Sequence, residues 1–283
     1  LAFLAGGMTS ASTNAASGRV VVGWFPKERR GLAMGIRQMS QPLGVTLAAV
    51  TVPQLAEGSG IRAALVLPIV LCAVLAVCCA IGITDPPRPA RATVATTTTA
   101  NPYRSSGFLW RVHAVSVLLV VPQFTLSTYG LVWLVGLGWS TPAAGLLVGA
   151  AQFVGAIGRI LVGGWSDRAG SRVGPLRIVA VSAAVVMAVL AVVDATHLAG
   201  AAVFLVLATS VTVADNGLAY TSVAEAAGPF WSGRALGAQN TGQFIAASAV
   251  GPGIGALVGA LGFAASFGIV AVLPLLAVPL VPR

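Results

Sequence analysis

The sequence predicts an all-α polytopic membrane protein, and three observations lead to this fold class. Hydrophobic residues make up 57% of the 283 positions and charged residues only 8%, whereas a soluble domain carries about 25% charged residues. Nine apolar runs come close to the roughly 20 residues that a helix needs to cross a bilayer. None of them alternates strictly between apolar and polar residues, as the strands of a membrane β-barrel do. Most of the surface should therefore contact the lipid bilayer.

Each apolar run is an expected transmembrane helix. The runs lie near residues 1–24, 33–55, 61–83, 109–133, 143–165, 174–194, 198–226, 235–260 and 263–281. Glycine is frequent, with 34 residues, and spacings such as Gly251, Gly255 and Gly259 recur within the runs. Small residues at such spacings let helices approach one another closely in lipid.

Residues 84–107 are the only long polar stretch of the chain. Several prolines and the tract Thr96–Thr99 predict a flexible or extended linker there. The linker separates three apolar runs within residues 1–83 from six within residues 108–283. We expect the first part to be the remainder of an N-terminal half, and the second to be a six-helix C-terminal half.

Basic residues gather in alternate connections between the runs. One set holds Lys27, Arg29, Arg30, Arg88, Arg91, Arg104, Arg168, Arg172, Arg234 and Arg283, and the opposite set holds only Arg62. Positive charge in short loops stays on the cytoplasmic side of the membrane. We therefore expect a multi-pass protein of the cell (cytoplasmic) membrane, with the central linker and the C-terminus in the cytoplasm. The net charge of +9 then reflects topology, and no nucleic-acid partner is expected.

Two stretches of the chain match at a constant offset of 202 residues. Ala33-Met34-Gly35 and Gln41 correspond to Ala235-Leu236-Gly237 and Gln243, and Asn14 corresponds to Asn216. The constant offset favours a duplicated half. Because six runs follow the linker, a duplication predicts six before it, so we expect three further helices upstream of residue 1.

The segment Gly163-Gly164-Trp165-Ser166-Asp167-Arg168-Ala169-Gly170-Ser171-Arg172 lies between the fifth and sixth runs. It resembles the loop motif of the major facilitator superfamily. The turn Trp24–Gly31 resembles that family's connection between helices four and five. The resemblance implies a bundle of two six-helix halves, of which this chain represents helices 4–12. The family's drug exporters carry a Gly-Pro-any-any-Gly-Gly signature in helix five, which this chain replaces by Gln41-Pro42-Leu43-Gly44.

In that family the loop motif acts as a conformational latch. The resemblance transfers this role to the matching positions, Gly163, Asp167, Arg168, Gly170 and Arg172. Asp167 can accept hydrogen bonds from Arg168 or Arg172, or face the N-terminus of a neighbouring helix, whose dipole favours an anion. The alternative is a solvated loop that only fixes the topology.

Asp215 is the strongest single candidate for a functional residue. It lies near the middle of the run 198–226, where an acidic residue costs about 2.5–3.5 kcal/mol on insertion scales. Its carboxyl group could carry a coupling proton or bind a cationic group of a solute. The alternative is a structural hydrogen bond to a neighbouring helix through Asn216. Asn14 could be its counterpart across the cavity in the other half, with packing between helices as the favoured alternative.

Further polar residues reach into the membrane at repeat-related positions. Arg37 is followed by Gln38 and Gln41, and a similar polar set recurs at Gln239, Asn240 and Gln243. Gln123 follows Pro122 near the middle of its run. These residues could contact a solute, although packing between helices explains each of them as well. Arg37, with Arg19 and Arg159, either snorkels to the interface or favours an anionic solute.

The resemblance implies a secondary active transporter that moves a small solute by alternating access, coupled to an ion such as the proton. The alternative is a truncated membrane protein that does not transport but serves as a binding or assembly subunit. We find no nucleophile elbow, phosphate loop or paired carboxylates, so neither an enzyme nor a cofactor is expected. Cys72, Cys78 and Cys79 share one apolar run without metal-ligand spacing, and no metal site is expected.

Overall fold

The computed structural model describes residues 2–87 and 100–283. Their elements, in chain order, are α1 (Ala2–Trp24), the 3₁₀ turn η1 (Lys27–Arg29), α2 (Arg30–Gln38), α3 (Ser40–Gly82), α5 (Pro102–Ser105), α6 (Phe108–Gly136), α7 (Thr141–Arg168), α8 (Val173–Thr196), α9 (Ala201–Thr212) and α10 (Asp215–Leu280). No strand occurs in these residues. The all-α prediction is therefore confirmed. The expected linker lies partly outside the described residues and ends in the short helix α5.

Five helical stretches of the described chain are long and apolar enough to cross a membrane: Gln54–Gly82, Phe108–Gly136, Thr141–Arg168, Val173–Thr196 and Ala201–Leu280. The last stretch contains three of the nine expected runs, and the count of nine spanning helices stays a prediction. The backbone leaves helical geometry within the long stretches, at Gly60 in α3 and at Gly228 and Gly262 in α10. All three glycines have positive φ, which side-chain-bearing residues rarely adopt.

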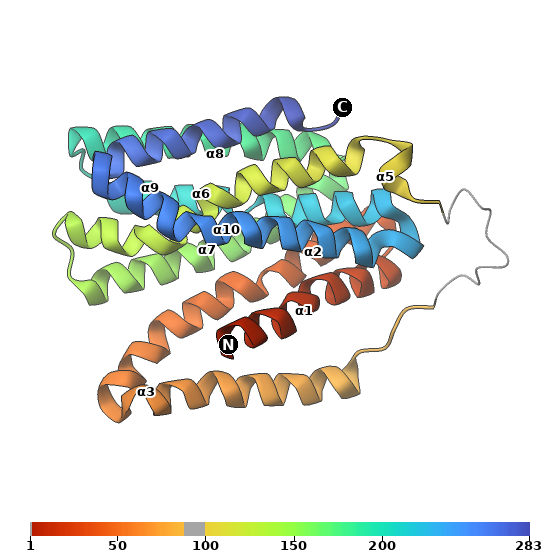
Figure 1. Ribbon diagram of the computed structural model, residues 1–283, viewed down its shortest axis with the longest axis horizontal. Coiled ribbons are helices and arrows are strands. Elements are labelled where there is room, and N and C mark those ends of the chain that lie inside the picture. Colours follow the sequence, from red (N-terminus) through yellow and green to blue (C-terminus); the bar gives the residue numbers. More distant parts are fainter. Residues whose placement is uncertain (1, 88–99) are drawn as a thin grey trace.

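The helices form an elongated bundle (Figure 1). The chain reverses direction within α3 and within α10, and the second part of α3 runs along one edge of the bundle (Figure 1). This edge segment has a mean hydropathy of 3.0 over its most apolar window, of which only 6% is buried. A soluble protein would not expose such a surface, so the segment indicates contact with lipid. The chain is thus a multi-pass α-helical membrane protein.

Apolar packing is densest among α6, α8, α9 and α10. One cluster places the Trp133 ring edge-on against Phe267, with Met187 and Leu205 also buried. A second cluster joins Met34 of α2 to Leu236 of α10 and their neighbours. The second cluster holds the part of the chain before the central linker against the part after it.

Helices α2 and α7 approach each other through glycine. A Cβ atom on Gly163 would lie 2.3 Å from the carbonyl oxygen of Gly31, and one on Gly35 would lie 2.5 Å from the carbonyl oxygen of Arg159. Real Cβ atoms do not come so near backbone atoms, so only glycine permits this distance between the two helices. The contact sets the position of the polar groups described next.

Candidate functional site

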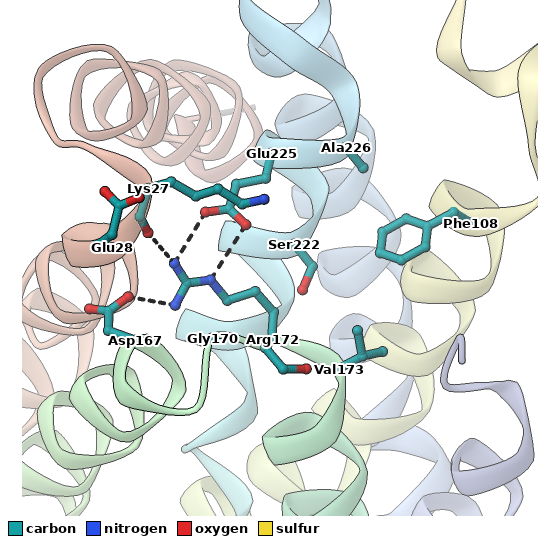
Figure 2. A pocket seen from close by; sticks show the side chains of 11 residues that line it. Lys27, Glu28, Phe108, Asp167, Gly170, Arg172, Val173, Ser222, Glu225 and Ala226 are labelled. Atoms are coloured by element: carbon teal, nitrogen blue, oxygen red, sulfur yellow. Dashed lines mark hydrogen bonds and ion pairs between the residues drawn. The ribbon is translucent and has the colours of Figure 1, made fainter.

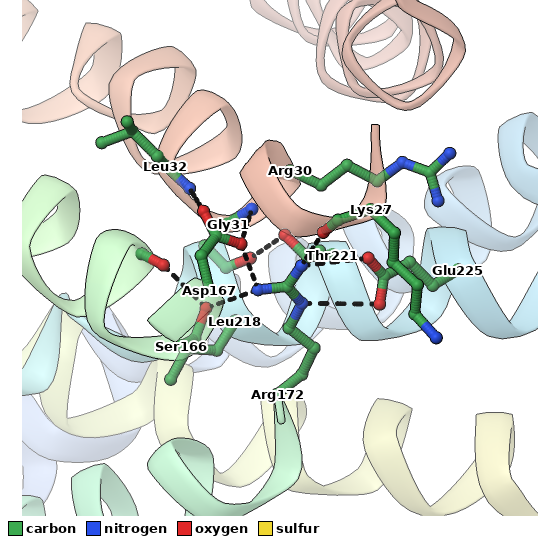
Figure 3. A network of polar contacts seen from close by, with 12 residues as sticks. Lys27, Arg30, Gly31, Leu32, Ser166, Asp167, Arg172, Leu218, Thr221 and Glu225 are labelled. Carbon is green, nitrogen blue, oxygen red and sulfur yellow. Dashed lines mark hydrogen bonds and ion pairs between the residues drawn. The ribbon is translucent and has the colours of Figure 1, made fainter. Parts of the chain in front are cut away.

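Asp167, at the end of α7, binds the start of α2. Its two carboxylate oxygens accept hydrogen bonds from the backbone N–H groups of Gly31, at 2.9 Å, and Leu32, at 2.8 Å (Figure 3). These amides belong to the first turn of α2, whose own hydrogen-bond partners are missing because a helix leaves its first N–H groups unpaired. The helix dipole also favours a negative charge at this end. One carboxylate therefore joins two segments separated by 135 residues or more.

Arg172 completes this arrangement from the turn that follows α7. Its guanidinium donates to Asp167 at 2.5 Å, to the Ser166 hydroxyl at 2.8 Å and to the carbonyl oxygen of Lys27 at 2.6 Å. It also contacts both carboxylate oxygens of Glu225 in α10, at 3.2 and 3.4 Å (Figure 2). We call Asp167, Arg172 and Glu225, with the backbone groups they bind, the loop-motif cluster.

The charges of the loop-motif cluster support one another. Burial alone would lower the pKa of Arg172, but its hydrogen bonds and its proximity to Glu225 and Asp167 outweigh burial and raise that pKa. The side chains of Arg172 and Asp167 are each 9% exposed and that of Glu225 is 13% exposed. At this depth the removal of one partner leaves the others buried without compensation. The cluster lines a cavity of about 510 Å³.

The predicted motif residues have different roles in the structure. Asp167 and Arg172 form the cluster, and Gly163 provides the close contact with Gly31. Gly170 has a positive φ of 60° and turns the chain toward Arg172. Arg168 is exposed, and within the described residues it has no hydrogen bond or ion pair.

A second set of polar side chains connects α1, α6 and α10. The side chain of Asn14 in α1 donates to Asn240 in α10 at 2.8 Å. The Tyr220 hydroxyl lies 2.9 Å from the side-chain oxygen of Asn240 and 3.0 Å from that of Gln243, and its one proton is shared between these two acceptors. Gln243 then donates to Asn216, and Asn216 to Gln123 in α6, each at 2.8 Å. We call this set of side chains the central amide network.

The central amide network surrounds a cavity of about 10 Å³, which is near the size that holds one water molecule. Polar side chains from α1, α2, α3, α6 and α10 line this cavity together with a few apolar ones: Asn14, Gln38, Gln41, Val120, Gln123, Phe124, Asn216, Tyr220, Gln243 and Phe244. The two polar pairs that match at the offset of 202, Asn14 with Asn216 and Gln41 with Gln243, are all among them. The cavity thus brings together five of the eight residues expected to contact a solute or a coupling proton.

Arg37 lies beside the cavity rather than in its wall. Its guanidinium donates to the side-chain and backbone oxygens of Asn14 and, at 2.8 Å, to the hydroxyl of Ser17. It also lies 5.7 Å from the centre of the Tyr220 ring, within the range of a cation–π contact. No acidic side chain in the described part of the chain forms an ion pair with Arg37. Gln239 is also outside the cavity, where it bonds to His113 and Ser116.

Asp215 occupies a break in the membrane-spanning helix. The run 198–226 was expected to be one helix, but α9 ends at Thr212 and α10 begins at Asp215. Arg159 of α7 donates to the carbonyl oxygen of Val213 in the break, at 2.9 Å, and to the carbonyl oxygen of Gln38 in α2. Asp215 and Arg159 are each 1% exposed. Both carboxylate oxygens of Asp215 and one guanidinium nitrogen of Arg159 lack a hydrogen-bond partner among the described residues.

The break between α9 and α10 is stabilised by the charged side chains beside it. A cation binds the carbonyl end of α9, and an acid begins α10, so each charge faces the end of a helix dipole that favours it. Arg159 and Asp215 also attract each other, although no direct ion pair between them is described. Broken helices at membrane depth are tolerated where protein surrounds them, and they supply backbone groups for binding ions and solutes.

Sequence reasoning missed two participants, Glu225 and Tyr220, and it missed the role of a third, Arg159. Glu225 follows Asp215 by ten residues, and its position at the end of an apolar run was the available signal. Tyr220 follows Asn216 by four residues, which places both on one helical face. The role of Arg159 depends on the break at residues 213–214, which no glycine or proline marks.

The fold and these two polar sites define a multi-pass helical membrane protein whose segments before and after the central linker meet at charged and amide contacts. The family model of the Major Facilitator Superfamily matches residues 1–250. An uncharacterized MFS-type transporter from each of two strains of Mycobacterium tuberculosis is 46% identical over 278 residues, or 98% of this chain. The chain belongs to the Major Facilitator Superfamily, and it spans 62% of the length of these relatives.

Solved structures show the same fold. The Escherichia coli fucose:proton symporter FucP aligns with 95% of this chain and 72% of its own chain, at a TM-score of 0.69 and 16% identity. A structure of FucP in the outward conformation aligns with 95% of this chain and 71% of its own, at a TM-score of 0.66 and 16% identity. The family assignment suggested by the loop motif is therefore confirmed.

Proposed function

We propose that the protein is a secondary active transporter that moves a small solute across the cell membrane by alternating access. One observation carries this proposal: residues 2–83 and 108–283 meet in two separate polar layers, the loop-motif cluster and the central amide network. Alternating access requires two such layers, because one must close an end of the bundle while the other binds the solute. The two halves would rock about the central cavity.

The loop-motif cluster would act as the latch of the closed end. Its basic neighbours assign this end to the cytoplasm by the distribution of positive charge. The arrangement described then corresponds to a transporter closed toward the cytoplasm. Because the central cavity has room for about one water molecule, solute entry requires the helices around it to separate.

Asp215 is the proposed site of the coupling proton. Its carboxyl group is buried without a hydrogen-bond partner among the described residues, and Arg159 links the neighbouring carbonyl of Val213 to Gln38 across the two parts of the chain. Protonation would remove the negative charge that attracts Arg159 and so loosen this link. FucP is a proton symporter of the same fold, which supports a proton as the ion.

Replacing Asp215 by asparagine should abolish accumulation of solute driven by a pH gradient while preserving exchange of the solute down its own gradient. The substitution keeps the shape of the side chain but removes the proton-binding group. Uptake would be measured in proteoliposomes with radiolabelled sugars, amino acids, monocarboxylates and amines, with and without an imposed pH gradient. Asp194→Asn, at the far end of α8, is the matched control and should transport normally. Unchanged accumulation in Asp215→Asn would remove Asp215 from the mechanism, and no exchange of any solute by the unaltered protein would contradict the transporter itself.

The proposed topology places Ser59 outside the cell and Ser105 in the cytoplasm. A single cysteine at position 59 should react with a membrane-impermeant maleimide in intact cells, and one at position 105 only after permeabilisation. Both positions are exposed, so accessibility depends on the side of the membrane. The three exposed native cysteines would first be replaced by serine. Labelling of position 105 in intact cells would overturn the assignment of the linker to the cytoplasm.

A further inference from the structure

The central amide network contains two series of hydrogen bonds with fixed directions, and the first begins at Arg37. A guanidinium only donates, so Asn14 must turn its side-chain oxygen toward Arg37. The nitrogen of Asn14 therefore faces Asn240, which accepts with its oxygen. The positive charge of Arg37 thus decides which way the amide of Asn14 points.

A second series begins at the Tyr220 hydroxyl, whose one proton is shared between the oxygens of Asn240 and Gln243. The nitrogen of Gln243 donates to the oxygen of Asn216. The nitrogen of Asn216 donates in turn to the oxygen of Gln123. The series ends on the amide nitrogen of Gln123, which has no acceptor among the described residues. Hydrogen bonds in series polarise one another, so the N–H groups of Gln123 become stronger donors.

The charged groups around the cavity favour an anion. The ionised groups that act on Tyr220, one of the lining residues, are Arg37, Asp215 and Arg159. Arg159 and Asp215 offset each other, which leaves the single positive charge of Arg37. No acidic side chain is among the residues that line the cavity. A cation at this depth that has no ion-pair partner among the described residues is costly, and an anion that enters the cavity would offset its charge.

We propose that the central cavity takes a small organic monocarboxylate, which accepts hydrogen bonds from the amide N–H groups of Gln123 and whose negative charge offsets that of Arg37. One net positive charge matches a monoanion, and a carboxylate accepts hydrogen bonds without donating any. Val120, Phe124 and Phe244 in the same wall provide apolar contact for the carbon chain of the solute. Gln38 and Gln41 make no side-chain hydrogen bonds to described residues, and their amides can adapt to the solute. The transport of this anion rests on the function proposed above, whereas its binding does not.

The test compares three probes of equal chain length that differ in charge: butyrate, butyramide and butylammonium. Binding to the purified protein in phosphatidylcholine nanodiscs would be measured by isothermal titration calorimetry. Butyrate should bind roughly tenfold more tightly than either other probe, a difference of about 1.4 kcal/mol. Equal binding of butyrate and butyramide, or no binding of butyrate, would overturn the proposal.

Two variants connect the preference to the network. Arg37→Gln should weaken butyrate binding roughly tenfold and leave butyramide binding unchanged, whereas Arg62→Gln, at an exposed position of α3, should alter neither. Gln123→Glu keeps the size of the side chain but ends the series on an acid, and it should reverse the preference toward butylammonium. An unchanged preference in either Arg37→Gln or Gln123→Glu would also overturn the proposal. Circular dichroism would verify that each variant folds.

Solute exchange in proteoliposomes separates this proposal from the proposed function. Anion-selective binding without exchange of any solute would contradict the transporter and leave the binding site standing. Exchange of neutral or cationic solutes without butyrate preference would contradict the monocarboxylate site and leave the transporter standing.

Discussion

Replacing Arg172 by alanine should open the end of the bundle that the loop-motif cluster closes. The substitution removes the hydrogen bonds to Ser166, Asp167, Glu225 and the Lys27 carbonyl. It also leaves Asp167 and Glu225 as two buried negative charges. Loss of one partner of a fully buried pair costs about 3–5 kcal/mol. We expect about 2–3 kcal/mol here, since the side chains retain 9–13% exposure at the end of the bundle.

The opening can be followed at Ser222, which lines the adjoining cavity and is 3% exposed. A cysteine at this position should react with a maleimide at least tenfold faster in the Arg172→Ala background, because about 1.4 kcal/mol already shifts an equilibrium tenfold. Arg168→Ala is the matched control, since Arg168 belongs to the same motif but is exposed. A labelling rate that rises equally in both variants would mean that overall loop charge, and not the cluster, holds this end closed.

The loop-motif cluster was partly predictable from the sequence. The motif identified Asp167 and Arg172, and the helix dipole argument predicted that Asp167 could face a helix N-terminus. Nothing in the spacing indicated that this helix would be α2 or that Glu225 would complete the cluster. Those contacts join residues 53 to 136 positions apart. They depend on how the helices pack, which a single sequence does not specify.

At the central cavity, the sequence predicted which distant residues meet but not the local backbone structure. The offset of 202 residues identified Asn14, Gln41, Asn216 and Gln243, and all four line one cavity. The sequence did not predict the break between α9 and α10, because Val213 and Ala214 are ordinary helix residues. The break is stabilised from outside, by the hydrogen bond from Arg159 in α7. An interaction from another helix thus overrides local preference, and it changes Asp215 from a mid-helix residue into the first residue of a helix.

Replacing Gly163 by alanine should destabilise the protein, although the same change one residue later should stabilise it. Alanine is about 1 kcal/mol more favourable than glycine inside a helix, and at Gly164 the added Cβ atom would meet only side-chain atoms, at 3.6 Å or more. At Gly163 the Cβ atom would lie 2.3 Å from the carbonyl oxygen of Gly31. Helix α2 must then move away from α7, and overpacking of this kind costs about 1–3 kcal/mol.

The same displacement should weaken the latch, because Gly31 also donates one of the two backbone hydrogen bonds that Asp167 accepts. Thermal unfolding in detergent, followed by tryptophan fluorescence, should therefore give a lower midpoint for Gly163→Ala and an unchanged or higher one for Gly164→Ala. Maleimide labelling of a cysteine at Ser222 should be faster only in Gly163→Ala. Equal midpoints and equal labelling rates in the two variants would mean that the contact between α2 and α7 is looser than described. Because a single methyl group separates each variant from the parent protein, opposite signs at adjacent positions can arise only from the distance between these two helices.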